Sequence, residues 1–307
     1  MILAFIATLL ISDAICLSTA PAAPPTAAAA TIFILAGQSN MSGRGGVVND
    51  TWDGVVPPAC SPNSAIMMLG PNLRWELAVE PLHKDIDLHK TCGIGPGMAF
   101  ASSIAGRGAI GKVGLVPCGR GGTRLEEWEK GSGSGLYEAA VRRGKAAERR
   151  GRIGGVVWYQ GESDTLNETD ASLYGRRLVK LFGDLRRDLE LPLLPIFQVA
   201  LASGAGPYKS RVRAAQLGMN LINVFTVDAE GLQLEPDNLH LTTPAQVRLG
   251  SMLASAYLNT MSLPSSAFFQ LSSAGSQTCF SNCRFSFWSE RLFGLVVLMT
   301  VSCFVIV

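Results

Sequence analysis

Short apolar runs alternate with amphipathic stretches through the middle of the chain, and this alternation predicts most of its elements. The apolar runs predict β-strands over residues 31–36, 113–116, 153–159, 194–200 and 224–228. The amphipathic stretches predict helices over residues 97–106, 137–150, 171–190, 209–220 and 244–259. Strands that alternate with helices are typical of an α/β fold, in which helices cover both faces of a parallel sheet.

The segment 43–96 interrupts this alternation, because it is long, rich in proline and glycine, and without clear periodicity. Loops of this length are usually functional or disordered. The alternation ends at the linker SLPSSAFF, which begins at residue 262. We therefore expect a single α/β domain over residues 31–262.

The two ends of the chain differ from this domain in composition. The first residues, MILAFIATLLI, form an apolar block followed by small residues, which predicts a signal or leader over residues 1–30 and hence a secreted or cell-wall protein. Residues 263–307 form a divergent tail whose last part, 292–307, is apolar and uncharged but short for a membrane span. Either this tail directs lipid anchoring and so associates the protein with a membrane, or it is a divergent extension.

Charge and cysteine content exclude several classes of protein. A net charge of +2 argues against a dedicated nucleic-acid surface, and we interpret the basic run 142–152 as the solvated face of a helix. Seven cysteines are too few for a disulfide scaffold, although Cys60 and Cys92 could pair in a secreted protein. Cysteine and histidine spacing does not match a zinc site.

The first candidate motif, Gly37-Gln38-Ser39-Asn40, follows directly on an apolar strand. Strand ends of open α/β sheets are where such folds keep their ligands. Glycine permits a tight turn there, after which the Ser39 hydroxyl would point out of the sheet and its N–H could face a developing oxyanion. The alternative is that Ser39 only caps a helix.

Two further motifs also end predicted strands. GLVPCGRGGT, residues 114–123, ends in glycines, which let a backbone N–H approach a ligand closely. VVWYQGESD, residues 156–164, delivers Gln160 and Glu162 from a buried strand, where polar groups need partners or a function. Gln160 could donate its amide N–H to an oxyanion. Glu162 could accept from an imidazole, pair with Arg44, or belong to a structural network.

The fourth motif, DNLHLTTPAQVRLG, places His240 three residues after Asp237 and just before a helix that Thr242 or Thr243 would cap. Asp237 could hold the imidazole through one nitrogen and leave the other nitrogen facing Ser39. Serine, histidine and carboxylate together are what nucleophilic acyl transfer needs. The other histidines, His83 and His89, lie in the charged stretch PLHKDIDLHK, and we interpret them as surface residues, one of which could instead touch substrate.

Together these motifs resemble the four sequence blocks of the SGNH hydrolase superfamily: Gly37-Gln38-Ser39-Asn40, the Gly121-Gly122 turn, residues 158–163, and Asp237-Asn238-Leu239-His240. More closely, they resemble plant carbohydrate esterases with a sialate O-acetylesterase-like (SASA) domain, which are related to carbohydrate esterase family six. The resemblance runs from about Ile32 to Tyr257. It implies a three-layer α/β/α sandwich with a central parallel sheet, as in flavodoxin-like folds.

The resemblance also implies residue roles. Ser39 would be the nucleophile, His240 the general base and Asp237 the acid that orients His240, with Glu162 as the rival acid. The oxyanion donors would be the N–H groups of Ser39 and Gly121 and the side chain of Gln160. No metal or organic cofactor is implied.

The expected activity is the removal of O-acetyl groups from sugars or cell-wall polysaccharides by way of an acetyl-enzyme. The expected partner is therefore an acetylated carbohydrate; the sequence does not fix an oligomeric state. One alternative is an inactive carbohydrate-binding protein on the same fold, with Trp52, Trp75 and Trp128 as stacking surfaces. Another is a lipase or broad esterase, which the polar segment 43–96 disfavours because lipid substrates need a wide apolar mouth.

Overall fold

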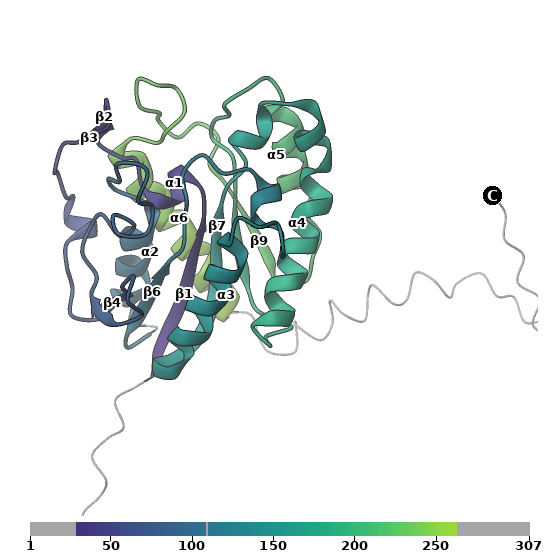
Figure 1. Cartoon of the computed structure of the whole chain (residues 1–307). Coiled ribbons are helices and arrows are strands. Elements are labelled where there is room, and N and C mark those ends of the chain that lie inside the picture. Colours follow the sequence, from purple (N-terminus) through teal and green to yellow (C-terminus); the bar gives the residue numbers. More distant parts are fainter. Residues whose placement is uncertain (1–28, 109, 263–307) are drawn as a thin grey trace, which may run out of the picture. The chain divides into compact units, whose positions relative to one another are not determined.

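The computed structural model describes residues 29–108 and 110–262 (Figure 1). The chain divides into two units, residues 1–261 and 262–307, and the first of these units carries the α/β fold. The expected leader, apart from residues 29 and 30, and the expected tail lie outside the described residues, as does the membrane association expected of residues 292–307. Within the described part, no helix combines the length and apolar character needed to cross a membrane.

A seven-stranded sheet forms the centre of the unit, in the order β5-β4-β6-β1-β7-β8-β9. All neighbouring strands are parallel except β4 and β5, which pair antiparallel at one edge. The strands are β1 (Ala30–Gly37), β4 (Ile66–Leu69), β5 (Trp75–Leu77), β6 (Val113–Pro117), β7 (Gly151–Tyr159), β8 (Ile196–Ala200) and β9 (Val224–Asp228). The five predicted strands and the parallel sheet are thus confirmed.

The five predicted helices are also present, with ends shifted by a few residues. The α-helices are α1 (Ser39–Ser42), α2 (Pro96–Ala105), α3 (Leu136–Ala147), α4 (Glu168–Asp188), α5 (Lys209–Leu217) and α6 (Thr243–Ser262). Short 3₁₀ turns are η1 (Pro58–Cys60), η2 (Leu125–Trp128), η3 (Glu148–Arg150) and η4 (Ser163–Thr165). The predicted helix 137–150 therefore corresponds to α3 together with η3.

Buried aromatic side chains join the helices to both faces of the sheet. On one face, Phe33 of β1 packs edge-on against Phe100 of α2 and Tyr257 of α6. On the other face, Trp158 of β7 packs edge-on against Phe182 of α4. Because successive side chains of a strand point to opposite faces, this pattern builds three layers, with α3 in front of β1 and α6 behind it in Figure 1. The expected three-layer α/β/α sandwich is confirmed.

The segment 43–96 contains structure that its sequence pattern does not reveal. It holds β4 and β5 as well as a two-stranded hairpin, β2 (Val47–Val48) and β3 (Thr51–Trp52). Asn49 and Asp50 turn this hairpin with φ of +50° and +56°, which is the geometry of a two-residue type I′ turn. Cys60 and Cys92 are both buried free thiols, so the structure does not show the disulfide expected for a secreted protein.

Parallel pairing brings the first three motifs to one edge of the sheet. The register aligns Gly37 at the end of β1 with Tyr159 at the end of β7. It also aligns Leu35 with Pro117 at the end of β6. Strands β6 and β7 lie on either side of β1, so the chain reverses its winding direction there, and such a switch point is where open α/β sheets hold their ligands.

Candidate active site

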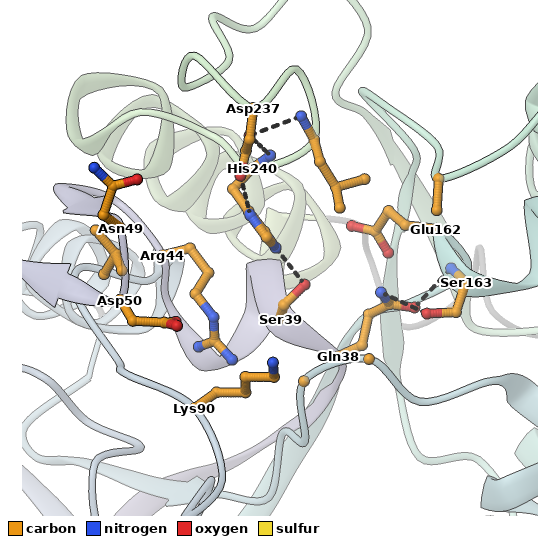
Figure 2. A pocket seen from close by; sticks show the side chains of 15 residues that line it. Gln38, Ser39, Arg44, Asn49, Asp50, Lys90, Glu162, Ser163, Asp237 and His240 are labelled. Carbon is orange, nitrogen blue, oxygen red and sulfur yellow. Dashed lines mark hydrogen bonds and ion pairs between the residues drawn. The ribbon is translucent and has the colours of Figure 1, made fainter.

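A cavity of about 300 Å³ opens at this edge of the sheet (Figure 2). Its walls come from all four motifs and from the segment 43–96. The lining residues are Gln38, Ser39, Arg44, Val47, Asn49, Asp50, Lys90, Gly121, Gly122, Glu162, Ser163, Ala205, Asp237, Leu239 and His240.

Ser39 lies at the first position of the short helix α1, directly after the sharp turn that ends β1. This turn requires glycine, because Gly37 has φ of +137° and a Cβ there would overlap the carbonyl oxygen of Tyr159. Gln38 occupies the N-cap position, and no side chain caps this helix. The interpretation of Ser39 as a helix cap is therefore wrong.

The Ser39 hydroxyl instead faces His240, across 201 positions of sequence. Its Oγ lies 2.9 Å from His240 Nε2, and His240 Nδ1 lies 2.6 Å from Asp237 Oδ2 (Figure 2). The structure thus places the three residues in one hydrogen-bonded chain in the order that the sequence predicts. This is the arrangement in which an imidazole can take a proton from a serine hydroxyl while a carboxylate fixes the ring.

Asp237 also shapes the loop that carries His240. Its Oδ1 accepts the backbone N–H groups of Leu239 and His240, at 2.9 and 3.0 Å. Asn238, between Asp237 and Leu239, has φ of +56°, a left-handed conformation that asparagine tolerates. The side chain of Thr242 accepts the N–H of Ala245 and so caps α6, as predicted.

The surroundings adjust the acidity of the histidine and its carboxylate. Burial lowers the pKa of His240 below its usual 6.5, although Asp237 acts in the opposite direction. Burial alone would raise the pKa of Asp237, but the N–H groups of His240 and Leu239 and the imidazole lower it overall. At neutral pH the site therefore holds a neutral imidazole beside a charged carboxylate, which is the state a general base needs.

Asn40, next to Ser39 in sequence, ties the serine turn to both neighbours of His240. It is fully buried; its Oδ1 accepts the N–H of Leu241 at 2.9 Å, and its Nδ2 donates to the Leu239 carbonyl at 3.3 Å. The Gln246 side chain on α6 donates to the Asn40 carbonyl at 3.1 Å. The sequence motif included Asn40, but residue spacing alone did not show this bracing role.

Glu162 contacts Asn40 rather than the imidazole. Asn40 Nδ2 donates to Glu162 Oε1 at 2.7 Å, and burial raises the pKa of Glu162 to about 7. The nitrogens of the His240 ring are occupied by Ser39 and Asp237, so Glu162 is not the acid that orients this histidine. Glu162 does line the cavity, but its expected pairing with Arg44 is also wrong, because Arg44 pairs elsewhere.

Gln160 does not face the cavity, which contradicts its predicted role as an oxyanion donor. It is fully buried, and its Nε2 donates to Asp164 Oδ2 at 2.6 Å and to the Thr123 carbonyl at 2.9 Å. The same nitrogen lies 3.2 Å from Gln38 Oε1. Gln160 therefore joins the first three motifs in the buried interior. Its amide N–H groups are already used in these contacts.

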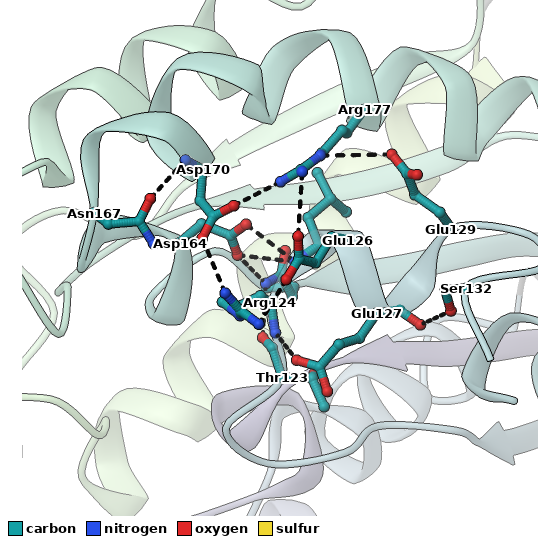
Figure 3. A network of polar contacts seen from close by, with 12 residues as sticks. Thr123, Arg124, Glu126, Glu127, Glu129, Ser132, Asp164, Asn167, Asp170 and Arg177 are labelled. Atoms are coloured by element: carbon teal, nitrogen blue, oxygen red, sulfur yellow. Dashed lines mark hydrogen bonds and ion pairs between the residues drawn. The ribbon is translucent and has the colours of Figure 1, made fainter. Parts of the chain in front are cut away.

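A polar network holds the turn that follows β6 (Figure 3). Both carboxylate oxygens of Asp164 accept the N–H of Leu125 at 3.1 Å, and Arg124 contacts Asp170 on α4 at 3.4 Å. Arg177 of α4 bridges Asp170 at 2.8 Å and Glu126 at 3.2 Å. The glycine turn at 119–122 is therefore anchored to η4 and α4 through the residues just after it.

Gly121 lines the cavity as expected, but its N–H is already engaged. It donates to Asp87 Oδ2 at 2.9 Å, and the same oxygen pairs with the Arg44 guanidinium at 2.7 Å. Asp87 is fully buried, and a Cβ at Gly121 would overlap the Arg44 guanidinium. The predicted oxyanion donor at Gly121 is thus bound to a carboxylate in this structure.

Two other predictions from single residues are wrong. His83 is buried rather than exposed, and burial lowers its pKa to about 4, whereas His89 is exposed as expected. Trp128 is 1% exposed and donates its indole N–H to Thr123, so it cannot serve as a stacking surface.

The segment 43–96 contributes cavity residues that the sequence did not identify. Asn49 and Asp50 from the β2–β3 turn and Lys90 from a later loop lie across Ser39 from Glu162 in the view of Figure 2. A type I′ turn signal was present at Asn49-Asp50, but nothing in the sequence placed that turn beside Ser39. Among residues 29–108 and 110–262, no cluster of three or more metal-ligating side chains is present.

Comparison with known proteins places this site in a family. Residues 29–259 match the family model described as carbohydrate esterase, sialic acid-specific acetylesterase. A protein of Arabidopsis thaliana described as a probable carbohydrate esterase is 55% identical over 239 residues, which are 74% of this chain and 90% of that protein.

Solved structures agree with that match. An Arabidopsis thaliana protein solved by X-ray crystallography, 55% identical, superimposes with a TM-score of 0.72 over 75% of this chain and 98% of its own. The crystal structure of NanS shares the fold at 17% identity, with a TM-score of 0.60 over 76% of this chain and 98% of its own. The chain therefore belongs to the SASA family of carbohydrate esterases, which are carboxylic ester hydrolases with an SGNH-type fold.

Proposed function

We propose that the protein removes O-acetyl groups from sugars or cell-wall polysaccharides, with Ser39 as nucleophile, His240 as general base and Asp237 as the orienting acid. The observation that carries this proposal is the hydrogen-bonded chain from Ser39 Oγ to His240 Nε2, 2.9 Å, and from His240 Nδ1 to Asp237 Oδ2, 2.6 Å. All three of these side chains line the cavity, where a substrate can reach the Ser39 hydroxyl.

In the proposed first step, His240 Nε2 takes the hydroxyl proton while Ser39 Oγ attacks the acetyl carbonyl carbon. The tetrahedral intermediate collapses, the bond to the sugar oxygen breaks, and His240 returns the proton to that oxygen. Water then attacks the acetyl-Ser39 ester with His240 again as base. Acetate leaves, and Ser39 regains its proton.

The oxyanion of that intermediate needs hydrogen-bond donors. The Ser39 N–H is the donor that we propose, because the first N–H groups of a helix have no acceptor within the helix. The Gly121 N–H can serve only if the substrate oxygen displaces Asp87 Oδ2, which lies 2.9 Å away. Gln160 is excluded from this role by its contacts with Asp164 and Thr123.

The polar character of the cavity supports a carbohydrate rather than a lipid. Asn49, Asp50, Arg44 and Lys90 line it beside Ser39, and these side chains can bind sugar hydroxyls. The family description, an acetylesterase that acts on sialic acid, supports the acetyl group as the part removed.

The proposal is tested by acetate release from acetylated xylan, acetylated pectin and a small aryl acetate, with the wild-type protein beside Ser39→Ala. We expect Ser39→Ala to lower turnover by roughly four orders of magnitude or more. Serine-dependent release from one polymer would identify the substrate. Residual turnover within about tenfold of wild type would exclude Ser39 as nucleophile, and no release by a folded wild-type protein would favour a binding protein on the same fold.

We also propose that the protein enters the secretory pathway, on the basis of the leader-like residues 1–30. Mass spectrometry of the mature protein tests this directly. Loss of a peptide that ends near residue 30 supports secretion, and an intact N-terminus argues against it.

A further inference from the structure

A second, larger hollow lies on the domain surface and shares no lining residue with the catalytic cavity. Its volume is about 660 Å³, and we call it the basic groove. One wall is the β4–β5 turn and the start of β5, and the other is the second half of α3 with η3. The lining residues are Leu73, Arg74, Trp75, Arg142, Lys145, Ala146, Arg149 and Arg150.

Five cationic side chains line this groove, and four of them have no acidic partner among the described residues. Arg142, Lys145 and Arg149 recur at helical spacing along α3 and η3, so they fall on one face. Lys145 pairs with exposed Glu190 at 3.3 Å. Across residues 29–108 and 110–262, no carboxylate forms an ion pair with Arg74, Arg142, Arg149 or Arg150.

The floor of the basic groove is apolar, and its main side chain, Trp75, packs on strand β6. Trp75 is half-buried, and its ring lies over Gly114 of β6, where a Cβ would come within 2.7 Å of it. Leu73, which is 39% exposed, and Ala146 complete this floor.

The two walls are fixed to each other by a buried arginine from the same basic run. Arg143 points inward, with 5% exposure, and donates to the carbonyls of Leu69, Gly70 and Pro117 at 2.6, 3.0 and 3.0 Å. This bracing joins α3 to the β4–β5 turn, so the groove between them is preformed. The basic run is therefore more than the solvated helix face expected from sequence, because it forms one wall of a shaped hollow.

We propose that the basic groove binds an anionic polysaccharide, a chain of uronate sugars, at a second carbohydrate site apart from the catalytic cavity. Guanidinium groups bind carboxylates through paired hydrogen bonds, and an indole ring offers an apolar surface to the C–H face of a sugar. A polymer that carries one carboxylate per sugar matches a row of cations over such a floor. The inference rests on the proposed function for its choice of a sugar polymer over other polyanions.

Titration calorimetry with polygalacturonate, an unacetylated uronate polymer, tests this binding on the full-length protein at low salt. The variant Arg142→Gln/Arg149→Gln removes two groove cations. The matched control, Arg107→Gln/Arg176→Gln, removes two exposed arginines that have no ion pair among the described residues. We expect the groove variant to bind roughly tenfold more weakly, since exposed charge contacts contribute modestly and are screened by salt. The control variant should bind within about twofold of wild type.

Three results would overturn the inference: equal loss in the groove and control variants, equal binding of a neutral galactan, or equal competition by a DNA duplex. The last result would instead indicate a general polyanion surface. Ser39→Ala should bind polygalacturonate as wild type does, and the groove variant should hydrolyse the aryl acetate at the wild-type rate. Failure of the esterase proposal is therefore visible separately from failure of the groove proposal.

Discussion

Asn40 Nδ2 donates a hydrogen bond of 2.7 Å to Glu162 Oε1, and both side chains are fully buried beside Ser39. The same amide nitrogen reaches the Leu239 carbonyl, and the amide oxygen accepts the Leu241 N–H. Asn40 therefore fixes the backbone on either side of His240, and Glu162 fixes Asn40. The distance between Ser39 Oγ and His240 Nε2 therefore depends on Asn40, although Asn40 contacts neither of these two atoms.

Replacing Asn40 by aspartate tests this bracing. The new carboxylate cannot donate to Glu162 or to the Leu239 carbonyl, and it sets two acidic groups face to face. We expect turnover of an aryl acetate to fall by about 10- to 100-fold and the free energy of unfolding by about 1–3 kcal/mol.

The matched control for that variant is Asn63→Asp. Asn63 is exposed, and its Oδ1 accepts the Ala65 N–H at 2.9 Å, a role in which aspartate serves equally well. We expect little change in turnover or in urea unfolding. Equal effects of the two substitutions would argue against a special role for Asn40.

Asp237→Asn should reduce turnover more than Glu162→Gln. Asp237 alone of the two carboxylates contacts the imidazole, at 2.6 Å, and asparagine in its place would favour the wrong tautomer of His240. Steady-state rates on the aryl acetate, compared at the pH optimum of each variant, decide between them. The reverse order would make Glu162 the acid that matters for catalysis.

The rate should depend on pH through His240. Only the neutral imidazole can accept the Ser39 proton, and burial lowers the pKa of His240 below 6.5. As pH falls, activity should therefore persist until below 6.5 and then decline with a single protonation. Asp237→Asn should move this midpoint lower still, because the carboxylate raises the histidine pKa. A wild-type midpoint above 6.5 in kcat/KM would contradict this assignment.

The buried pair of Arg44 and Asp87 should show strong coupling in a double-mutant cycle. Their side chains are 6% and 0% exposed, so Asp87→Asn leaves the guanidinium without a counter-charge at a cost of about 3–5 kcal/mol in unfolding free energy. Arg44→Met combined with Asp87→Asn should recover part of that loss. Urea unfolding of the four proteins measures the coupling, and strictly additive effects would show that the pair is not an energetic unit.

Stability should decline with rising pH because of Glu80. Burial raises its pKa from 4.5 to about 8, so between these values the folded protein keeps a proton that the unfolded chain releases. The free energy of unfolding should fall through this window, and Glu80→Gln should flatten the fall. Urea unfolding at pH 5 and pH 8 measures this fall. The control is Glu76→Gln at an exposed position, which should leave the pH dependence of the free energy of unfolding as in wild type.

The sequence predicted the strands of five residues or more and missed those of two to four residues. β1 and β7 are long, largely apolar runs, and runs of this length and composition are typical of strands buried on both faces. β5 has three residues at the sheet edge, of which two are exposed, so it carries no apolar pattern. The same difficulty hid the hairpin that brings Asn49 and Asp50 to the cavity.

The positions of the candidate site residues could be predicted, but the directions of their donors could not. Parallel strands end at one edge, which is enough to gather Ser39, Gly121 and Gln160 near one another. The Gly121 N–H and the Gln160 amide are bound instead by the carboxylates of Asp87 and Asp164. The strand pattern does not predict these two acceptors, because both lie outside the strands.

The stretch PLHKDIDLHK shows why such partners escape detection. It forms a turn in which the Asp87 N–H donates to the His83 carbonyl, and these two side chains point inward while Lys84 and His89 stay exposed. In sequence, Asp87 is indistinguishable from its exposed neighbour Asp85. What distinguishes Asp87 in the fold is its contact with the buried Arg44 guanidinium and with the Gly121 N–H.

The long sequence separation between serine and histidine has a consequence for synthesis on the ribosome. Ser39 and its partner His240 lie 201 residues apart. At roughly 5–20 residues per second, the histidine is translated on the order of 10–40 s after the serine. A nascent chain therefore carries an unpartnered Ser39 hydroxyl for most of its elongation, and the proposed hydrolysis can begin only after His240 has left the exit tunnel and packed.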